Sequence, residues 1–308
     1  MLSNVLVLCT RNRPLEVRTC LDTVRVQTLV PNRVLVVDSS NDGTTEQLVA
    51  ELASTWPAES ELGYQRCEPG TTRQRSAGID ATTDEIVHFI DDDTVLEPGY
   101  FAAIIEEFTN DRDGTVGGVG GFVTDQPPHR FRRVDAWLGL DGAAQGVVLP
   151  SGRGVRVYDR PAAPIAVDWL PGCAMSYRRA VFDAERPNLA LGRDRNGEDV
   201  ELSYRVRQHW TLVITPHARM EHHESARERR SRELLVRVEL ISRYERVRAG
   251  TGRLSRRAFW VSAFGQLFWY GSKGIVTWSP ERLMIARNTA VAITAIARSR
   301  GRAPIRVG

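Results

Sequence analysis

The sequence contains almost no lysine, and Lys273 is the only one among its 41 basic residues. Arginine therefore carries nearly all of the positive charge, and its planar guanidinium group suits diphosphates and anionic lipid headgroups. The net charge of +3 is too small to indicate a nucleic-acid partner. The four cysteines, Cys9, Cys20, Cys67 and Cys173, have no paired spacing, so they predict neither a zinc site nor a disulfide framework. A reducing cytoplasm is the simplest setting for such a chain.

Long hydrophobic runs are also missing. No uninterrupted apolar stretch reaches the roughly eighteen residues that indicate a membrane-spanning helix. The N-terminus enters the apolar run 5–8 directly, with no basic region before it and no small-residue cleavage site after it, which predicts no signal peptide. We therefore expect a cytoplasmic protein that does not span a membrane. Its 308 residues allow one large domain with an appendage, or two smaller domains.

The first hundred residues alternate short apolar runs with helical patterns. Runs at 5–8 and 33–37 are followed by amphipathic stretches at 15–26 and 45–52. Strands that alternate with helices are typical of parallel βαβ units, which predicts an α/β fold with a Rossmann-like, mostly parallel sheet flanked by helices. Each apolar run ends in a polar cluster, so we expect these clusters to meet at one rim of the sheet, as a nucleotide site requires.

Three consecutive carboxylates, Asp91, Asp92 and Asp93, follow the strand-like run 85–90. Adjacent anions repel unless a cation joins them, and Mg²⁺ or Mn²⁺ prefers oxygen ligands. The predicted ligand set is Asp91, Asp93 and a substrate diphosphate. The alternative is a solvated turn in which Asp93 or Thr94 caps the next helix.

The second half of the chain is less regular. Residues 117–123 predict a glycine-rich strand, and residues 125–168 predict a substrate loop or a partly disordered lid rather than packed structure. Regular patterns return at 169–182, 199–206 and 211–214. Beyond His223 the chain becomes an arginine-rich helical tail, in which glycines interrupt the aromatic stretch 259–278. We place a domain boundary near Ser225, with a catalytic domain at 1–225 and a helical extension at 226–308.

Four charged clusters follow one another in a fixed order: Asp38, then Arg73 and Arg75, then the acidic triplet, then Glu198 and Asp199. This order resembles the family 2 glycosyltransferases, which are inverting enzymes of the GT-A fold that use nucleotide-diphosphate sugars. The resemblance is carried by the segments 7–14, 36–44, 75–78, 89–93 and 197–203, and it extends over about residues 4–224. One departure is Ser76, which stands where the family usually has asparagine.

The resemblance implies roles on the donor side. It divides the catalytic domain into a nucleotide-sugar-binding half at about 1–123 and an acceptor half at about 124–225. Asp91 and Asp93 would hold Mg²⁺ or Mn²⁺, and Asp92 would face the ribose or support the ligands. The remaining donor-binding residues would be Thr10, Arg13, Asp38, Arg73 and Arg75. The alternative for Asp38 is a turn cap before residues 41–43. The alternative for Arg73 and Arg75 is surface pairing with Asp80, Asp84 or Glu85.

The resemblance also implies a general base. Inversion requires a group that removes the proton of the acceptor hydroxyl. Neighbouring residues on a helix point about 100° apart and cannot both face one sugar. The resemblance assigns the role of the base to Asp199 and leaves Glu198 to orient the acceptor. The alternative is an acidic first turn that is stabilised by the helix dipole. His222 is expected to complete the metal site, although a lone histidine is commonly structural.

On the acceptor side, Trp169 and Gly172 resemble the segment in which a glycine lets the backbone approach the sugar. Trp169 is interpreted as stacking on a sugar ring or, alternatively, as a core residue. The expected acceptor is a glycan or a lipid-linked sugar of the cell envelope. The tail suits peripheral attachment to the inner face of an anionic membrane. The alternatives are packing against the catalytic domain and packing in a homodimer.

Two other functions remain open from sequence. A sugar-1-phosphate nucleotidyltransferase also uses an α/β nucleotide fold with Mg²⁺, but it requires a glycine-rich loop after the first strand, where this chain has the glycine-free residues 10–14. A non-catalytic sugar-nucleotide-binding protein would keep the fold and lose the activity. The intact acidic residues Asp91, Asp93 and Asp199 favour the enzyme.

Overall fold

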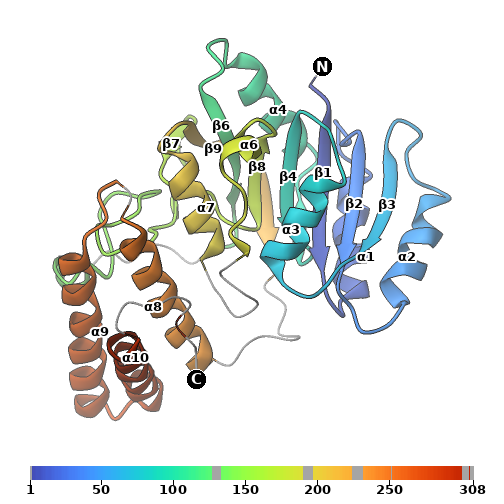
Figure 1. The fold of residues 1–308 in the computed structure, drawn as a ribbon. Helices are drawn as coiled ribbons and strands as arrows, with labels where there is room; N and C mark the ends of the chain where they lie inside the picture. Colours follow the sequence, from blue (N-terminus) through green and yellow to red (C-terminus); the bar gives the residue numbers. More distant parts are fainter. Residues whose placement is uncertain are drawn as a thin grey trace.

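The structure is a computed structural model that describes residues 2–126, 133–189, 197–223, 232–250, 252–299 and 305. In this part of the chain, nine strands form one sheet in the order β3-β2-β1-β4-β8-β6-β9-β5, with β7 paired to β9 (Figure 1). The strands are β1 (Asn4–Thr10), β2 (Arg33–Asp38), β3 (Glu61–Arg66), β4 (Ile86–Asp91), β5 (Thr94–Leu96), β6 (Val116–Val123), β7 (Ile165–Val167), β8 (Ala174–Arg178) and β9 (Thr211–His222).

The four strands from β3 to β4 are parallel, and β1 lies between β2 and β4. The other half of the sheet is mixed, since β8 runs antiparallel to both β4 and β6. Thr10 pairs with Asp38, and Cys9 pairs with Asp91, so the ends of β1, β2 and β4 reach the same edge. The α/β fold is confirmed, and its parallel half brings the predicted polar clusters together.

Helices cover both faces of the sheet. One face carries α1 (Pro14–Val24), α2 (Thr44–Ala53) and α4 (Tyr100–Asn110), and the other carries α3 (Thr71–Asp80), α6 (Val181–Ala184) and α7 (Glu198–Val206). Strand β1 serves both layers because successive side chains point to opposite faces: Leu6 and Leu8 join the first core, while Val5 and Val7 join the second. This double coverage explains why the central strands are continuous apolar runs.

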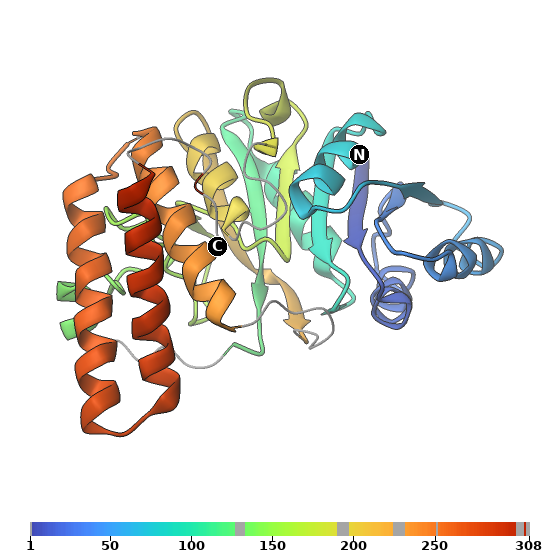
Figure 2. The same ribbon diagram turned by 60° about the horizontal axis from the view of Figure 1, so that its bottom comes forward.

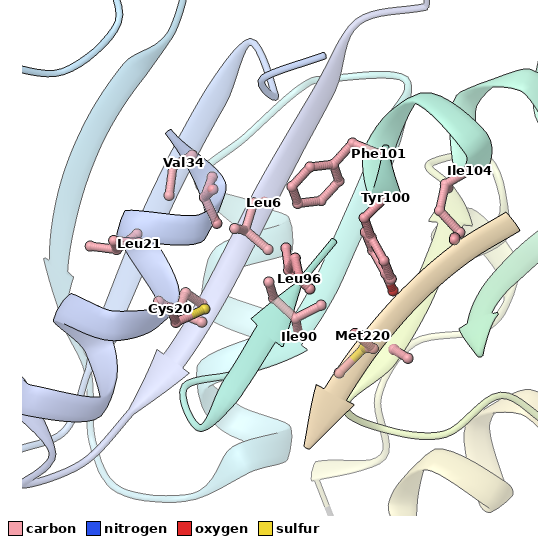
Figure 3. Packing of buried hydrophobic residues seen from close by; sticks show 14 of the residues in the cluster. Leu6, Cys20, Leu21, Val34, Ile90, Leu96, Tyr100, Phe101, Ile104 and Met220 are labelled. Atoms are coloured by element: carbon pink, nitrogen blue, oxygen red, sulfur yellow. The ribbon is translucent and has the colours of Figure 1, made fainter. Parts of the chain in front are cut away.

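The first core lies between β1, β4 and helices α1 and α4 (Figure 3). Leu6, Leu21 and Phe101 are completely buried in it, and each such side chain contributes about 1.5–3 kcal/mol. Met220 of β9 reaches the same core beside Tyr100. The two halves of the sheet are therefore stabilised by one continuous hydrophobic layer.

The glycines of β6 leave room for large side chains from neighbouring elements. A Cβ atom on Gly121 would lie 2.5 Å from the ring of Tyr100, and one on Gly117 would lie 2.5 Å from Trp210. Gly118 makes the same kind of approach to Tyr177, at 2.8 Å. The glycines of β6 therefore allow aromatic side chains of neighbouring elements to pack directly against the strand.

The segment 125–168 is irregular, as predicted, with only α5 (Arg133–Trp137) and β7 in its described part. The prediction that it lacks packed structure was wrong for the described residues. Val148, Val155 and Val157 are at most 5% exposed, and Val155 donates its backbone N–H to Val147. These valines belong to runs that are too short to predict an element, and tertiary contacts bury them.

The C-terminal extension folds as three helices, α8 (Arg232–Ala249), α9 (Arg256–Val276) and α10 (Pro280–Arg298). They stand beyond the end of the sheet opposite β3 (Figures 1 and 2). The predicted boundary at Ser225 lies outside the described residues. The glycines that interrupt the aromatic stretch do not end the helix, because α9 is continuous to Val276 and its glycines are contact points. A Cβ on Gly265 would lie 2.7 Å from Leu138, and one on Gly274 would lie 2.8 Å from Leu283.

In the described part of the chain, no helix combines the length and the apolar character that are needed to cross a bilayer.

Candidate active site

The acidic triplet lies at the end of β4, and its middle member points inward. Asp92 is 4% exposed; it accepts hydrogen bonds from Thr10 Oγ1 at 2.6 Å and Arg13 Nη1 at 3.0 Å. Burial raises the pKa of Asp92 to about 7, against the opposing effects of Thr10 and Arg13. Arg13 also contacts Asp93, at 3.3 Å. The structure thus places Thr10 and Arg13, which were predicted to bind the donor, in contact with the triplet itself.

The outer members of the triplet form a cluster with His222. One ligand atom each from Asp91, Asp93 and His222 lie within 4.8 Å of one another. The pairing of β5 with β9 creates this cluster, because Thr94 stands opposite His222. The Nε2 atom of His222 lies 3.0 Å from Asp93 Oδ1 and 3.7 Å from Asp91 Oδ2. Of the two adjacent histidines, His223 pairs instead with Glu221.

The charges around His222 favour a cation at this position. Burial alone lowers the pKa of His222, but its hydrogen bond to Asp93, together with Cys173 and the charge of Asp91, raises it to about 11. The imidazolium therefore acts as the counter-ion of the two carboxylates. A divalent cation would take over this role and release the proton. Two carboxylates and an imidazole are a donor set that suits Mn²⁺ or Mg²⁺.

Arg75 connects this cluster to helix α7. It is 5% exposed and lies on α3, from where its Nη2 donates to the carbonyl of Gly172 at 3.0 Å and lies 3.7 Å from Asp91. Its Nη1 donates to Glu198 at 3.3 Å. Burial raises the pKa of Glu198, although the charge of Arg75 opposes the shift. One guanidinium group thus fixes the distance between the triplet and the acidic start of α7.

Asp199 lies beside Arg75 on the first turn of α7. Its Oδ2 accepts the backbone N–H of Gly172 at 3.0 Å, and its Oδ1 accepts that of Val200 at 2.8 Å. The helix begins after Gly197, whose φ of 81° is the left-handed conformation that glycine adopts without strain. Arg246 of α8 donates to the carbonyl of Gly197 at 2.7 Å. The C-terminal extension therefore contacts the residue that immediately precedes Glu198 and Asp199.

The predicted base-binding or ribose-binding residue, Asp38, is completely buried at the end of β2. Its Oδ1 accepts from the backbone N–H and hydroxyl of Ser40, and its Oδ2 accepts from Tyr64 Oη at 3.0 Å. Gln74 joins the ends of β1 and β2 by donating to the carbonyls of Thr10 and Val37, both at 2.8 Å. Arg73, by contrast, is exposed on α3.

Trp169 lies in the interior. It is 5% exposed, its Nε1 donates to the carbonyl of Val155 at 3.1 Å, and its ring packs against Gly154. It also lines a cavity that Asp199 borders. The core interpretation fits its burial, and the cavity leaves one edge of the ring available to a ligand.

Sequence reasoning missed three contributors to this site. Tyr64 lies on β3, a strand whose sequence gave no clear alternation, and it holds Asp38. Gln74 stands between Arg73 and Arg75 in the sequence, and this position could have indicated that it belongs to the site. Arg246 belongs to a helix in which nearly every turn carries arginine, so nothing in the sequence distinguishes it.

A family model for glycosyl transferase family 2 matches residues 5–183. No curated protein sequence matches significantly. The mannosyltransferase PcManGT from Pyrobaculum calidifontis, in complex with GDP-Man and Mn²⁺, is similar with a TM-score of 0.61 at 15% identity, covering 98% of this chain and 88% of that one. GalNAc-T7 with UDP, GalNAc and Mn²⁺ gives a TM-score of 0.60 at 15% identity, covering 91% of this chain and 58% of the other. The predicted GT-A fold and enzyme class are confirmed: because the family model spans more than half of its residues, the chain belongs to glycosyl transferase family 2.

Proposed function

We propose that this glycosyltransferase binds a nucleotide-diphosphate sugar with Mg²⁺ or Mn²⁺ and transfers the sugar, with inversion, to an acceptor hydroxyl. The observation that carries the proposal is the cluster of Asp91, Asp93 and His222 at the rim of the sheet. The two similar structures hold GDP-Man and UDP, respectively, each with Mn²⁺. A cation bound by this cluster would stabilise the negative charge that develops on the departing nucleoside diphosphate.

The donor side uses the ends of β1, β2 and β4. Asp38 is a fixed acceptor for the base or ribose, because Tyr64 and Ser40 hold its carboxylate in place. Arg75 is a buried cation next to Asp91, where a diphosphate would approach. Arg73, which is exposed on the same helix, would reach the donor from the solvent side. Asp92 accepts a hydrogen bond from Arg13, which also contacts Asp93, so Asp92 helps to fix the position of the Asp93 carboxylate.

Asp199 acts as the general base, and Glu198 orients the acceptor. The two hydrogen bonds from Gly172 and Val200 hold the Asp199 carboxylate in one orientation, and a positioned base contributes about 10²- to 10⁴-fold to the rate. As Asp199 takes the proton of the acceptor hydroxyl, the acceptor oxygen bonds to the anomeric carbon on the face opposite the departing nucleoside diphosphate, whose bond to that carbon breaks, and the product has the inverted configuration. Glu198 accepts a hydrogen bond from Arg75, whereas Asp199 accepts the backbone N–H of Gly172, so different partners hold the two carboxylates, which agrees with separate roles.

Calorimetric titration of GDP and UDP, with and without Mn²⁺, tests the metal site. Wild-type protein should bind at least one of the two nucleotides more tightly with Mn²⁺. Asp93→Ala should lose this enhancement and still fold cooperatively, with a melting temperature lowered by the loss of its contacts with Arg13 and His222. Asp113→Ala removes an exposed carboxylate outside the cluster and is the matched control. If Mn²⁺ strengthens nucleotide binding equally in Asp93→Ala and wild type, the assignment of Asp93 as a metal ligand is wrong.

We also propose that the extension attaches to the inner face of an anionic membrane, next to a glycan or lipid-linked acceptor. Phe264 and Phe268 on α9, and Trp278 in the turn that follows it, are 54%, 73% and 89% exposed. Lys273 lies near these residues, with its Nζ 4.6 Å from the ring of Trp269. Aromatic side chains flanked by basic residues are typical of helices that bind a membrane surface.

Co-sedimentation with vesicles that contain anionic lipid tests this attachment. Phe268→Glu should reduce the bound fraction severalfold, whereas Val26→Glu, at a similarly exposed apolar site on the catalytic domain, should bind like wild type. Binding should weaken as salt screens the basic residues. If both variants sediment like wild type, and light scattering gives a dimer that Phe268→Glu dissociates, the exposed face of α9 is a dimer interface instead.

A further inference from the structure

A polar cavity of 420 Å³ lies between α7 and the C-terminal helices. Its lining comes from the segment 135–158, the start of α7, and helices α8 and α9. Asp199 is part of this lining, so the cavity adjoins the proposed general base. The volume falls within the range of about 300–1,000 Å³ that is typical of small-molecule sites. The cavity is therefore placed where an acceptor substrate would meet Asp199.

Arginine side chains give this cavity its character. Arg153, Arg156, Arg243 and Arg246 all line it. Arg243 is only 2% exposed, and its Nη2 donates to Ser262 Oγ at 2.6 Å. Its Nε and Nη1 atoms, however, are buried without a hydrogen-bond acceptor among the residues that the structure describes. Buried charged donors without acceptors are unfavourable, so a small shift of the lining that brings a ligand's acceptors to these two N–H groups would remove an existing cost.

The charges around Arg243 favour an anionic ligand. Burial, together with the charges of Arg153 and Arg246, lowers the pKa of Arg243 to about 10, and the charge of Glu239 opposes this shift. Glu239 is 3.7 Å from Arg243 Nη1, which is beyond hydrogen-bond distance. The guanidinium groups thus repel one another across the lining. An anion between them would remove this repulsion and supply acceptors to Arg243.

We propose that this cavity binds the acceptor through an acidic group, a phosphate monoester or a carboxylate carried by a sugar. Arg243 and Arg153 hold the anion, while the carboxylates of Asp135 and Asp141 accept hydrogen bonds from sugar hydroxyls and Asp199 meets the reacting one. Four arginines and four carboxylates line the cavity, and Arg243, which lacks acceptors at two of its nitrogens, is the group that favours an acidic sugar over a neutral one. This assignment rests on the proposed transferase function, because it takes Asp199 as the reacting end of the cavity.

The test measures the binding of three probes to the full-length protein with Mn²⁺ and the nucleoside diphosphate that binds best. Glucose 6-phosphate and glucuronate carry the two acidic groups, and glucose is the neutral control. At least one acidic probe should bind about tenfold or more tightly than glucose, as expected for charge-assisted hydrogen bonds. The two acidic arms distinguish a phosphate site from a carboxylate site.

Two arginine variants test whether the preference for acidic probes over glucose arises in this cavity. Arg153→Gln is chosen because Arg153 is only half-buried, so this variant should fold normally, and it should reduce the preference for the acidic probe to within about threefold of glucose. Arg112→Gln, an exposed arginine next to α4, should leave the preference unchanged. Equal binding of acidic and neutral probes, or an unchanged preference in Arg153→Gln, overturns the assignment.

The same titrations distinguish a failure of the proposed acidic-acceptor site from a failure of the proposed donor site. If no nucleoside diphosphate binds with Mn²⁺, the donor site fails, and the probes are then compared on the unloaded protein. An acidic preference that disappears in Arg153→Gln would still establish the anion site there. Conversely, normal nucleotide binding without any acidic preference would refute the cavity assignment alone.

Discussion

Substituting Gly172 tests whether the position of Asp199 sets the rate. Gly172 lies between the two groups that organise the site: its N–H donates to Asp199 at 3.0 Å, and its carbonyl accepts from Arg75 at 3.0 Å. A Cβ atom at this position would lie 3.1 Å from Arg75 Nη2 and 3.3 Å from both Cβ and Oδ2 of Asp199. These distances are shorter than ordinary van der Waals contact, so one or both side chains must move by a few tenths of an ångström.

The size of the displacement predicts the size of the effect. A misplacement of about 1 Å can reduce a rate by about 100-fold, so a shift of a few tenths of an ångström should reduce it by about 3- to 10-fold. The metal ligand Asp93 keeps its contacts with Arg13 and His222, so donor affinity should fall only by what a small shift of Arg75 costs. Gly172→Ala should therefore lower kcat more than it raises KM for the donor.

Release of nucleoside diphosphate, measured with the donor and Mn²⁺ at saturation, is the appropriate assay. Gly99→Ala is the matched control, because a Cβ at Gly99 meets nothing within 4 Å. The decisive comparison repeats Gly172→Ala in the Asp199→Asn background. If Gly172 acts through Asp199, the second loss should nearly disappear, since coupled positions are not additive. An equal loss in both backgrounds would refute the argument, as would full activity in Gly172→Ala itself.

Two other predictions follow from individual side chains. Asp199→Asn should keep donor binding and lower transfer by about 10²- to 10⁴-fold, and NMR of the wild-type product should give the inverted anomer; a retained anomer would contradict the assigned base. Burial lowers the pKa of His88 to about 3, whereas an unfolded histidine titrates near 6.5, so the folded state loses stability as the pH falls from about 6.5 towards 3. Between pH 7.5 and 5.0, protonation of this histidine in the unfolded state should lower the free energy of unfolding by about 2 kcal/mol. In urea denaturation, His88→Gln should therefore lose about 2 kcal/mol less than wild type over this pH range. An equal loss in both proteins would exclude His88 as the cause.

The parallel half of the sheet was predictable because local patterns specify it. Apolar runs, intervening amphipathic stretches and polar strand ends are all short-range signals, and they correctly indicated β1, β2, β4 and the rim that joins them. The triplet Asp91 to Asp93 was visible for the same reason. Strand β3 escaped notice because its residues are only partly buried and do not alternate clearly.

The remaining features depend on contacts between distant residues. His222 meets Asp93 only because β5 and β9 pair, which no local pattern indicates. The buried valines of segment 125–168 and the continuous helix α9 have the same origin: close packing against other elements makes ordered structure from residues that appear irregular in sequence. Glycine illustrates this well, since Gly265 reads as a helix breaker until its contact with Leu138 is known.

The site therefore combines two structural origins. Its donor side, from Thr10 to Asp93, is built on strand ends within residues 5–183, the part of the chain that the family model matches. Asp199 and the arginine-lined cavity lie partly or wholly beyond that match. Arg246 contacts both Gly152 and Gly197, and a Cβ on Gly197 would lie 2.8 Å from its Nη2, so α8 fits closely against the start of α7. Changes in the C-terminal helices should consequently alter acceptor use and the position of Asp199 while the donor rim, held by its own hydrogen bonds, stays unchanged.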